Sequence, residues 1–194
     1  MNGVQNQVKA VFLDRDGTLN EEMGYINHQS RFRIFEFVPE AIKKINDAGY
    51  LAIVITNQSG IARGYFDEQL LQRVHDKLLN EASLRGGRIE KIYYCPHHPT
   101  EGIGHYKMDC SCRKPKIGML KLAEKEFQID LNGSIMIGDR YKDIEFAHRA
   151  GLKAIMVLSG YGIGEYTYQR FNWKEQPDLI CENINEAAER LHEI

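Results

Sequence analysis

Two acidic side chains, Asp14 and Asp16, directly follow an apolar run at residues 10–13 that is typical of a buried parallel strand. Because side chains two apart in an extended chain project to the same side, both carboxylates would face one way where the strand ends. One could attack as a nucleophile while the other transfers a proton, and a hard cation such as Mg²⁺ would offset their repulsion. Aspartate followed by Gly17 and Thr18 is also common in ordinary turns. This motif alone therefore does not distinguish a hydrolase active site from a turn without a catalytic role.

The elements that must position these groups alternate along the chain. Short apolar runs predict strands at residues 10–13, 50–55, 88–94, 134–139, 153–158 and, more briefly, 179–181. Amphipathic patterns with capping residues predict helices at residues 39–49, 67–85, 117–127, 143–150 and 183–191. Residues 21–33 and 159–164 are expected to be loops. This alternation predicts an α/β fold, a Rossmann-like three-layer arrangement of a parallel sheet with helices on both faces.

Polar residues follow three of these strands. In a parallel sheet the carboxyl ends of the strands meet at one edge, where ligands bind. The residues expected at that edge are Asp14, Asp16, Thr56, Asn57, Asp139 and Asp143. With a nearby lysine they supply what phosphoryl transfer needs: a nucleophile, a proton carrier, donors for phosphoryl oxygens, a cation and a further acid for Mg²⁺. Thr56 and Asp143 could instead cap a strand or a helix, but their convergence with the others favours a phosphatase.

In these motifs the chain resembles the haloacid-dehalogenase superfamily of phosphatases, and the resemblance extends over nearly the whole chain. It implies that Asp14 attacks phosphorus and becomes an aspartyl-phosphate. Asp16 would protonate the leaving alcohol and then deprotonate the hydrolytic water. Mg²⁺ would be bound by the carboxylates of Asp14 and Asp139 and by the carbonyl oxygen of Asp16, and Asp143 would support the metal site from behind.

The same resemblance assigns the residues that stabilise the transferring phosphoryl group. These are Thr56, the backbone N–H of Asn57 and the side chain of Lys114. Lys116 is an alternative for the lysine, although the superfamily pattern favours Lys114. Lys114 and its neighbour Arg113 could also be solvated surface charges, which is the commoner fate of such residues.

A loop at residues 95–112 carries a second set of metal-binding side chains. Three thiolates and one imidazole form a complete tetrahedral zinc set with no open position, which is typical of structural zinc. The set is Cys95, His97, Cys110 and Cys112. Bound zinc could order this loop, which has almost nothing apolar to pack, and would position the lysine that follows it. His98 and His105 are alternative ligands, and the alternative without metal is three buried cysteines beside a surface histidine.

Around residues 14–18, 56–64, 95–99 and 112–115 the motifs are similar to those of the zinc-containing heptose-bisphosphate phosphatases, a branch of that superfamily. The similarity implies removal of the 7-phosphate of D-glycero-D-manno-heptose 1,7-bisphosphate, in the synthesis of nucleotide-activated heptose for lipopolysaccharide or surface glycans. Histidinol-phosphate phosphatases are similar in the same motifs and are the alternative. The substrate-binding residues that the similarity implies are Glu22, Met23, Gly24, Tyr25, Asn57, Gln58, Ser59, Arg113 and Arg140.

A doubly phosphorylated sugar would suit two of these cations. Arg113 and Arg140 could hold the phosphate that stays, while Lys114 and Mg²⁺ act on the one that leaves. A relative carries lysine at the position of Arg140, and this change keeps the charge but alters its geometry. Because no interval has room for a separate cap domain, residues 21–33 and the zinc loop would determine specificity.

Length and composition set the remaining expectations. The 194 residues predict a single domain at residues 8–194 after a flexible N-terminus at residues 1–7. With 25 basic and 27 acidic residues the net charge is near zero, which argues against nucleic acid or membrane as a partner. The same balance disfavours a zinc-stabilised binding module without catalysis. Without an apolar run of about 20 residues or a signal peptide, the chain is expected in the cytoplasm, and without a heptad stretch it is expected to be a monomer.

Overall fold

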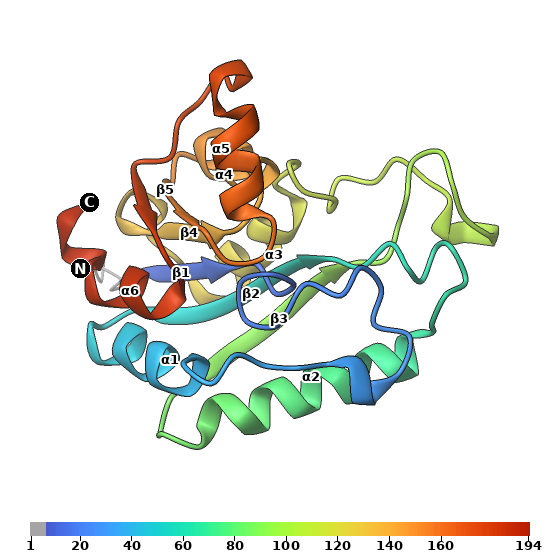
Figure 1. Ribbon diagram of the computed structural model, residues 1–194, viewed down its shortest axis with the longest axis horizontal. Coiled ribbons are helices and arrows are strands. Elements are labelled where there is room, and N and C mark those ends of the chain that lie inside the picture. The colour runs from blue at the N-terminus through green and yellow to red at the C-terminus, as the bar shows by residue number, and fades with distance from the viewer. Residues whose placement is uncertain (1–6) are drawn as a thin grey trace, which may run out of the picture.

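A six-stranded parallel sheet runs through the computed structural model, which describes residues 7–194 (Figure 1). The strands are β1 (Ala10–Leu13), β2 (Leu51–Asn57), β3 (Ile89–Cys95), β4 (Ile135–Gly138), β5 (Lys153–Val157) and β6 (Leu179–Cys181). Their order across the sheet is β3-β2-β1-β4-β5-β6, and every neighbouring pair is parallel. The predicted fold class is therefore confirmed. Residues 1–6 of the N-terminal segment that was expected to be flexible lie outside the described residues.

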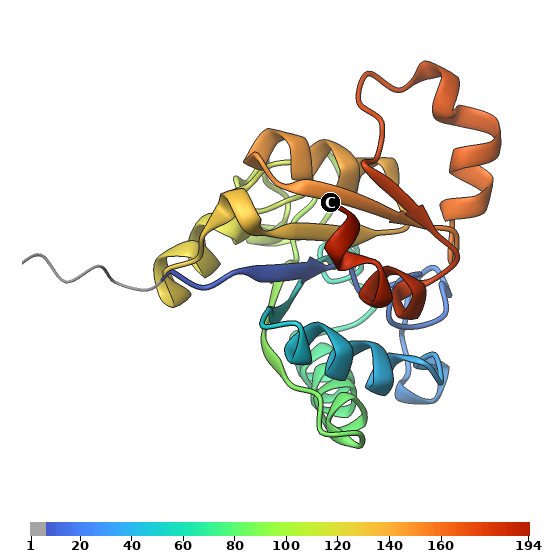
Figure 2. The same ribbon diagram turned by 90° about the vertical axis from the view of Figure 1, so that its left-hand side faces the viewer.

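Helices cover both faces of the sheet (Figures 1 and 2). One face packs against α1 (Val38–Asp47), α2 (Glu68–Ser83) and α6 (Ile184–Glu189), and the other against α3 (Gly118–Phe127) and α4 (Tyr141–Ala150). Alternation along β1 explains this, because Val11 and Leu13 enter the first core while Ala10 and Phe12 enter the second. Both cores are needed to bury a parallel strand on its two sides.

One helix, α5 (Gly162–Gln169), lies where the sequence predicted only a glycine-rich loop at residues 159–164. That prediction is wrong from Gly162 onward. The sequence does not indicate this helix because it contains two glycines and has no apolar stripe. Only Gly162 and Glu165 are buried in it. A side chain at position 162 would collide with the carbonyl oxygen of Val157, so the close approach of α5 to β5 requires glycine.

The helix α4 begins at Tyr141, two residues before the predicted start at Asp143. Its cap explains the difference: Arg140 is the N-cap residue, and the Asp143 carboxylate reaches back to accept a hydrogen bond from the Arg140 N–H at 3.2 Å. Single 3₁₀ turns complete the chain: η1 (Gln29–Arg31), η2 (Gly104–Tyr106), η3 (Leu131–Gly133), η4 (Arg170–Asn172) and η5 (Leu191–Glu193).

The connections that leave the carboxyl ends of β1 and β2 consist of a loop or turn and the helix that packs on the sheet. Between β1 and β2 the described chain holds a loop, η1 and α1, and between β2 and β3 it holds a turn and α2. Within residues 7–194 no separate cap domain is inserted at either place, so the edge of the sheet above β1, β2 and β4 is covered by loops alone. In the same described range, no helix has the length and apolar character that crossing a membrane would need.

Candidate active site and metal cluster

A cleft of about 220 Å³ opens at the carboxyl ends of β1, β2 and β4. Its lining residues are Asp14, Asp16, Glu22, Gly24, Tyr25, Thr56, Asn57, Ser59, Arg113, Arg140, Lys142 and Tyr161. Most were predicted from the sequence, but Lys142 and Tyr161 were not. Two predicted contacts, Met23 and Gln58, do not line this cleft: Met23 packs against the core and Gln58 is buried beneath the cleft.

Three buried carboxylates meet beneath the cleft. One oxygen each from Asp14, Asp139 and Asp143 lies within 4.8 Å of the others. The ammonium of Lys114, which is 3% exposed, lies 2.9 Å from Asp14 Oδ1 and 2.8 Å from Asp143 Oδ1. With all four groups ionised, three negative charges face one positive charge, so the cluster has an excess of two negative charges that a divalent cation would balance.

Asp139 is the member of the cluster that most lacks a partner. Burial and the neighbouring charges of Asp14 and Asp143 raise the pKa of its carboxyl. Oxygen Oδ2 accepts the N–H of Tyr161 at 2.9 Å, whereas the buried Oδ1 has no hydrogen-bond partner among the described residues. Gly17, with φ of 84°, turns the chain past this carboxylate, and any larger residue there would collide with it. An oxygen-seeking cation fits this donor set.

Asp14 is better compensated. Burial raises the pKa of its carboxyl, but the charges of Lys114 and Lys142 and a hydrogen bond from the Arg15 N–H at 2.8 Å more than offset this, so the pKa lies below its ordinary value. Burial lowers the pKa of Lys114, yet Asp14 and Asp143 raise it further, and the net direction is upward. The two groups therefore form a charged pair at neutral pH.

Asn57 holds Lys114 in place from β2. Its side-chain oxygen accepts the Lys114 N–H at 3.0 Å, and its amide nitrogen donates to the Lys114 carbonyl at 3.1 Å. The alternative lysine, Lys116, is exposed and pairs with Asp109 at 2.5 Å. The structure therefore brings Lys114 to the carboxylates and leaves Lys116 outside.

The Asp16 carboxylate points into a separate network that the sequence interpretation missed. The Arg15 guanidinium donates to both of its oxygens at 2.7 Å, Asn20 donates to Oδ1 at 3.0 Å and Gln58 donates to Oδ2 at 2.8 Å. Gln58 also donates to Thr56 Oγ1 at 2.8 Å. Every partner in this network donates to Asp16, so these hydrogen bonds fix the direction of its carboxylate.

Arg15 is itself only 1% exposed, so its charged side chain must be held by other residues of the interior. Its Nη1 lies 3.2 Å from His75 Nε2, and its guanidinium lies 5.6 Å from the centroid of the Phe32 ring. Because arginine only donates, His75 must accept at Nε2 and be neutral; burial and the Arg15 charge lower the pKa of His75 to about 3. The position of Arg15 between two aspartates was the only signal for it in the sequence.

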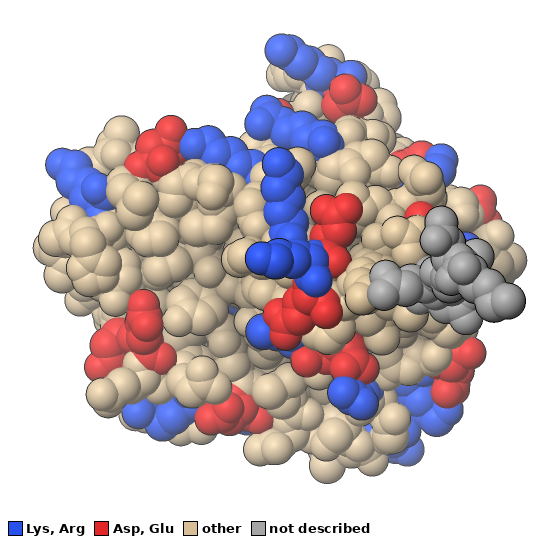
Figure 3. Space-filling model, turned by 180° about the vertical axis from the view of Figure 1, so that it is seen from behind, with Lys and Arg blue, Asp and Glu red and all other residues tan. Residues whose placement is uncertain are grey.

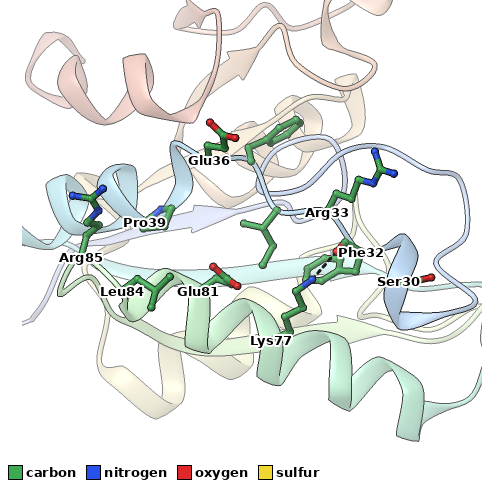
Figure 4. A pocket seen from close by; sticks show the side chains of 11 residues that line it. Ser30, Phe32, Arg33, Glu36, Pro39, Lys77, Glu81, Leu84 and Arg85 are labelled. Carbon is green, nitrogen blue, oxygen red and sulfur yellow. Dashed lines mark hydrogen bonds between the residues drawn. The ribbon is translucent and has the colours of Figure 1, made fainter.

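A second hollow, of about 520 Å³, lies on the other side of Phe32, between residues 30–39 and α2 (Figure 4). Lys77 of α2 donates to the Phe32 carbonyl at 3.0 Å there, which ties the loop after β1 to the helix. None of the predicted catalytic, metal-binding or substrate-binding residues lines this hollow. The bond from Lys77 fixes the backbone of Phe32, whose ring lies against the Arg15 guanidinium.

The predicted cysteine and histidine ligands come together in the loop after β3. The Sγ atoms of Cys95, Cys110 and Cys112 lie 3.1–3.3 Å apart, and His97 Nδ1 lies 3.5 Å from Cys112 Sγ. The three cysteines are free thiols, and the group could hold a metal ion. The loop is tied to the cleft, because Arg113 Nη1 donates to the His97 carbonyl at 3.2 Å.

The two alternative histidines lie outside the cluster. His98 Nδ1 accepts the N–H of Glu101 at 3.0 Å and its Nε2 lies 3.3 Å from Arg63, while the His105 ring packs on Tyr106. Within residues 7–194, the only groups of acidic, histidine or cysteine side chains close enough to share a metal are this cluster and the three buried carboxylates.

Comparison with known proteins gives consistent matches. A family model described as HAD-hydrolase-like matches residues 111–187. The D-glycero-beta-D-manno-heptose-1,7-bisphosphate 7-phosphatase of Haemophilus ducreyi is 47% identical over 159 residues, which are 80% of this chain and 86% of that protein. The D-glycero-alpha-D-manno-heptose-1,7-bisphosphate 7-phosphatase of Photorhabdus laumondii is 40% identical over 163 residues, which are 84% and 89% of the two chains. The crystal structure of D,D-heptose 1,7-bisphosphate phosphatase from B. bronchiseptica, complexed with magnesium and phosphate, superposes with a TM-score of 0.83 at 30% identity, covering 95% of this chain and 98% of that one.

Proposed function

The chain belongs to the haloacid-dehalogenase-like family of heptose-1,7-bisphosphate 7-phosphatases, and we propose that it removes the 7-phosphate of D-glycero-D-manno-heptose 1,7-bisphosphate. Enzymes of this family are phosphoric monoester hydrolases. One observation carries the proposal beyond the likeness: a single cleft is lined by Asp14, which pairs with the buried Lys114 beneath it, and by Arg113, Arg140 and Lys142. A cleft with two separate sets of cations suits a substrate with two phosphate groups.

In the first step the Asp14 carboxylate attacks the phosphorus of the 7-phosphate, and the bond from phosphorus to the sugar oxygen breaks. Asp16 gives its proton to that oxygen as the alcohol leaves. In the second step Asp16, now a carboxylate, takes a proton from water, which attacks phosphorus and releases phosphate from Asp14.

Lys114, the Thr56 hydroxyl and the N–H of Asn57 hold the phosphoryl oxygens during both steps. Lys114 suits this role because Asn57 fixes its backbone and two carboxylates fix its ammonium. The carboxylates of Asp14 and Asp139 and the carbonyl oxygen of Asp16 would hold Mg²⁺, with Asp143 behind them. When bound there, Mg²⁺ supplies positive charge that offsets the negative charge on the phosphoryl oxygens.

The cysteine and histidine cluster is a structural zinc site in this proposal. Three soft thiolates and an imidazole are a donor set that zinc favours, and four protein ligands leave no position for substrate. Zinc there orders residues 95–112 and, through the bond from Arg113 to the His97 carbonyl, the wall of the cleft. We place the enzyme in the cytoplasm as a monomer that serves lipopolysaccharide or surface-glycan heptose synthesis, where free thiols persist.

The test is phosphate release from both anomers of heptose 1,7-bisphosphate and from histidinol phosphate, with and without Mg²⁺, with identification of the sugar product. We expect Mg²⁺-dependent release from the bisphosphate, heptose 1-phosphate as product, and a kcat/KM at least about a hundredfold above that for histidinol phosphate. A preference for histidinol phosphate would contradict the proposed substrate, and no Mg²⁺-dependent release from either would contradict catalysis.

A further inference from the structure

Arg140 is held at the wall of the cleft by two residues around the start of α5. Its Nε donates to Glu165 Oε1 at 2.5 Å, and its guanidinium carbon lies 4.1 Å from the centroid of the Tyr161 ring. Tyr161 is the N-cap residue of α5 and Glu165 lies in its first turn, and this helix projects beyond the sheet in Figures 1 and 2. Arg140 therefore has a charge partner on one edge and an aromatic face on one side.

Glu165 is itself a fixed anchor. The residue is only 8% exposed, and its second oxygen, Oε2, accepts the N–H of Tyr141 at 2.7 Å in the first turn of α4. Both carboxylate oxygens are thus used, one for the helix backbone and one for the guanidinium. This arrangement fixes the direction of the Arg140 side chain at the N-cap of α4.

The rest of the Arg140 guanidinium is left for a ligand. Among residues 7–194, the only side-chain hydrogen bond and ion pair of Arg140 are made by Nε to Glu165, so its two terminal nitrogens have no protein partner. The side chain is 35% exposed and lines the cleft beside Arg113, Lys142 and Tyr161. A guanidinium held by Nε presents its terminal N–H groups as a fork, which matches two oxygens of one phosphate.

We propose that Tyr161 and Glu165 are positioning residues that hold Arg140 as the receptor for the phosphate group that the reaction leaves on the sugar. The inference rests on the proposed function. An unrestrained arginine would lose much side-chain freedom on binding, so a guanidinium that is already oriented binds its phosphate more tightly. Because the retained phosphate does not react, this contact improves substrate binding and leaves the chemical step unchanged.

The experiment compares two substrates across two pairs of variants. Tyr161→Ala removes the aromatic face, and Glu165→Gln places an amide against the Arg140 Nε–H with little change of shape. The matched controls are Tyr168→Ala, on the exposed side of α5 at 81% exposure, and Glu145→Gln, an acid on α4 that pairs with Arg149. The substrates are heptose 1,7-bisphosphate and p-nitrophenyl phosphate, which has only the reacting phosphate.

For both test variants we expect KM for the bisphosphate to rise about five- to tenfold with kcat within about twofold of wild type. The values of kcat/KM for p-nitrophenyl phosphate should stay within about twofold, as should all constants of both controls. Inhibition by the product heptose 1-phosphate should weaken in parallel. Tyr161→Phe keeps the ring and should recover most of the affinity.

Two outcomes would overturn this inference while leaving the proposed function in place. If both substrates lost kcat/KM equally, Tyr161 and Glu165 would be structural supports of the whole site. If an active wild type and both variants shared the same bisphosphate KM and the same product inhibition, Arg140 would not need them. A wild type without activity on heptose bisphosphate would overturn the proposed function and this inference with it, which distinguishes the two failures.

Discussion

Arg15 and His75 show how one neutral side chain supports a charged one inside the protein. His75 is 4% exposed, and its unprotonated Nε2 accepts a hydrogen bond from Arg15. Arg15 in turn donates a hydrogen bond to the carboxylate of Asp16. Protonating His75 would place two positive groups 3.2 Å apart in a buried site. The ring therefore stays neutral while the protein is folded, although it takes up a proton readily once it is exposed to water.

This difference predicts a pH dependence of stability. The pKa of His75 is about 3 in the folded protein against an ordinary value of 6.5, so below pH 6.5 the unfolded chain binds the extra proton and the folded chain does not. Its contribution makes the folded state less stable as pH falls from 6.5 toward 3. We expect the unfolding free energy of His75→Gln, which keeps an acceptor for Arg15, to fall less steeply by up to about 1.4 kcal/mol per pH unit in that window.

Urea unfolding of both proteins at several pH values between 4 and 7 measures this slope. All other titrating groups are common to the two chains, so the difference isolates His75. Identical slopes would show that His75 has the same pKa in the folded and unfolded protein, which would contradict a neutral His75 that accepts from Arg15.

At the scale of elements, the proposed zinc site should stabilise the loop at residues 95–112 more than packing does. Ile103 and Met108 are 62% and 45% exposed, so these apolar side chains contribute little buried area. Arg113 and Lys114 follow Cys112 directly, and Arg113 bonds back to the His97 carbonyl. Loss of the metal should therefore disturb the cleft as well as the loop.

We expect the Cys112→Ser protein to bind no zinc, because one of the four proposed ligands is changed. We also expect kcat/KM for the bisphosphate to fall by more than about tenfold, because disordering the loop would displace Arg113 and Lys114 at the site. Metal analysis of the purified protein and steady-state kinetics measure the two effects. Cys181→Ala is the control, since Cys181 is buried on β6 away from the cluster. Full activity in a zinc-free Cys112→Ser protein would contradict the role of the loop.

The elements differ in how well the sequence reveals them. Strands such as β1 and β4 are short apolar runs that end at an acid, so their bounds and their polar ends were predictable. The helix α5 was not, because its two glycines disfavour a helix and its contacts come from distant residues. Glu165 of α5, for example, accepts the N–H of Tyr141 of α4 at 2.7 Å, and nothing local indicates that pair.

The same distinction applies to the candidate site. The three buried carboxylates and the cysteine cluster were predictable from residue type, spacing and the rule that parallel strands end together. The direction of the Asp16 side chain was not, since it depends on Arg15, Asn20 and Gln58 meeting it in space. Lys142 and Tyr161 were missed for a related reason: single polar residues in α4 and before α5 carry no pattern.

At the scale of the whole molecule, one sheet edge collects residues that lie far apart in the chain. Asp14 and Lys114 are separated by 100 positions, yet their charged groups lie 2.9 Å apart. Away from this edge the surface is mixed: on the face shown in Figure 3, lysine and arginine side chains lie next to aspartate and glutamate. The expectation of a small charged substrate is therefore tied to the cleft, which is lined by Arg113, Arg140 and Lys142 together with Asp14, Asp16 and Glu22.

The central claim is that Asp14 is the nucleophile, and an attempt to capture its phosphorylated form tests that claim most directly. Borohydride reduces an acyl phosphate to an alcohol, so an aspartyl-phosphate formed during turnover would become homoserine at position 14. The enzyme is quenched while it hydrolyses heptose 1,7-bisphosphate with Mg²⁺, reduced, digested and analysed by mass spectrometry. We predict homoserine at position 14, and none without substrate or in Asp14→Asn, which should also lose activity by more than about a thousandfold. Steady phosphate release with position 14 unmodified and the modification at another acid, or undiminished turnover by Asp14→Asn, would contradict the account.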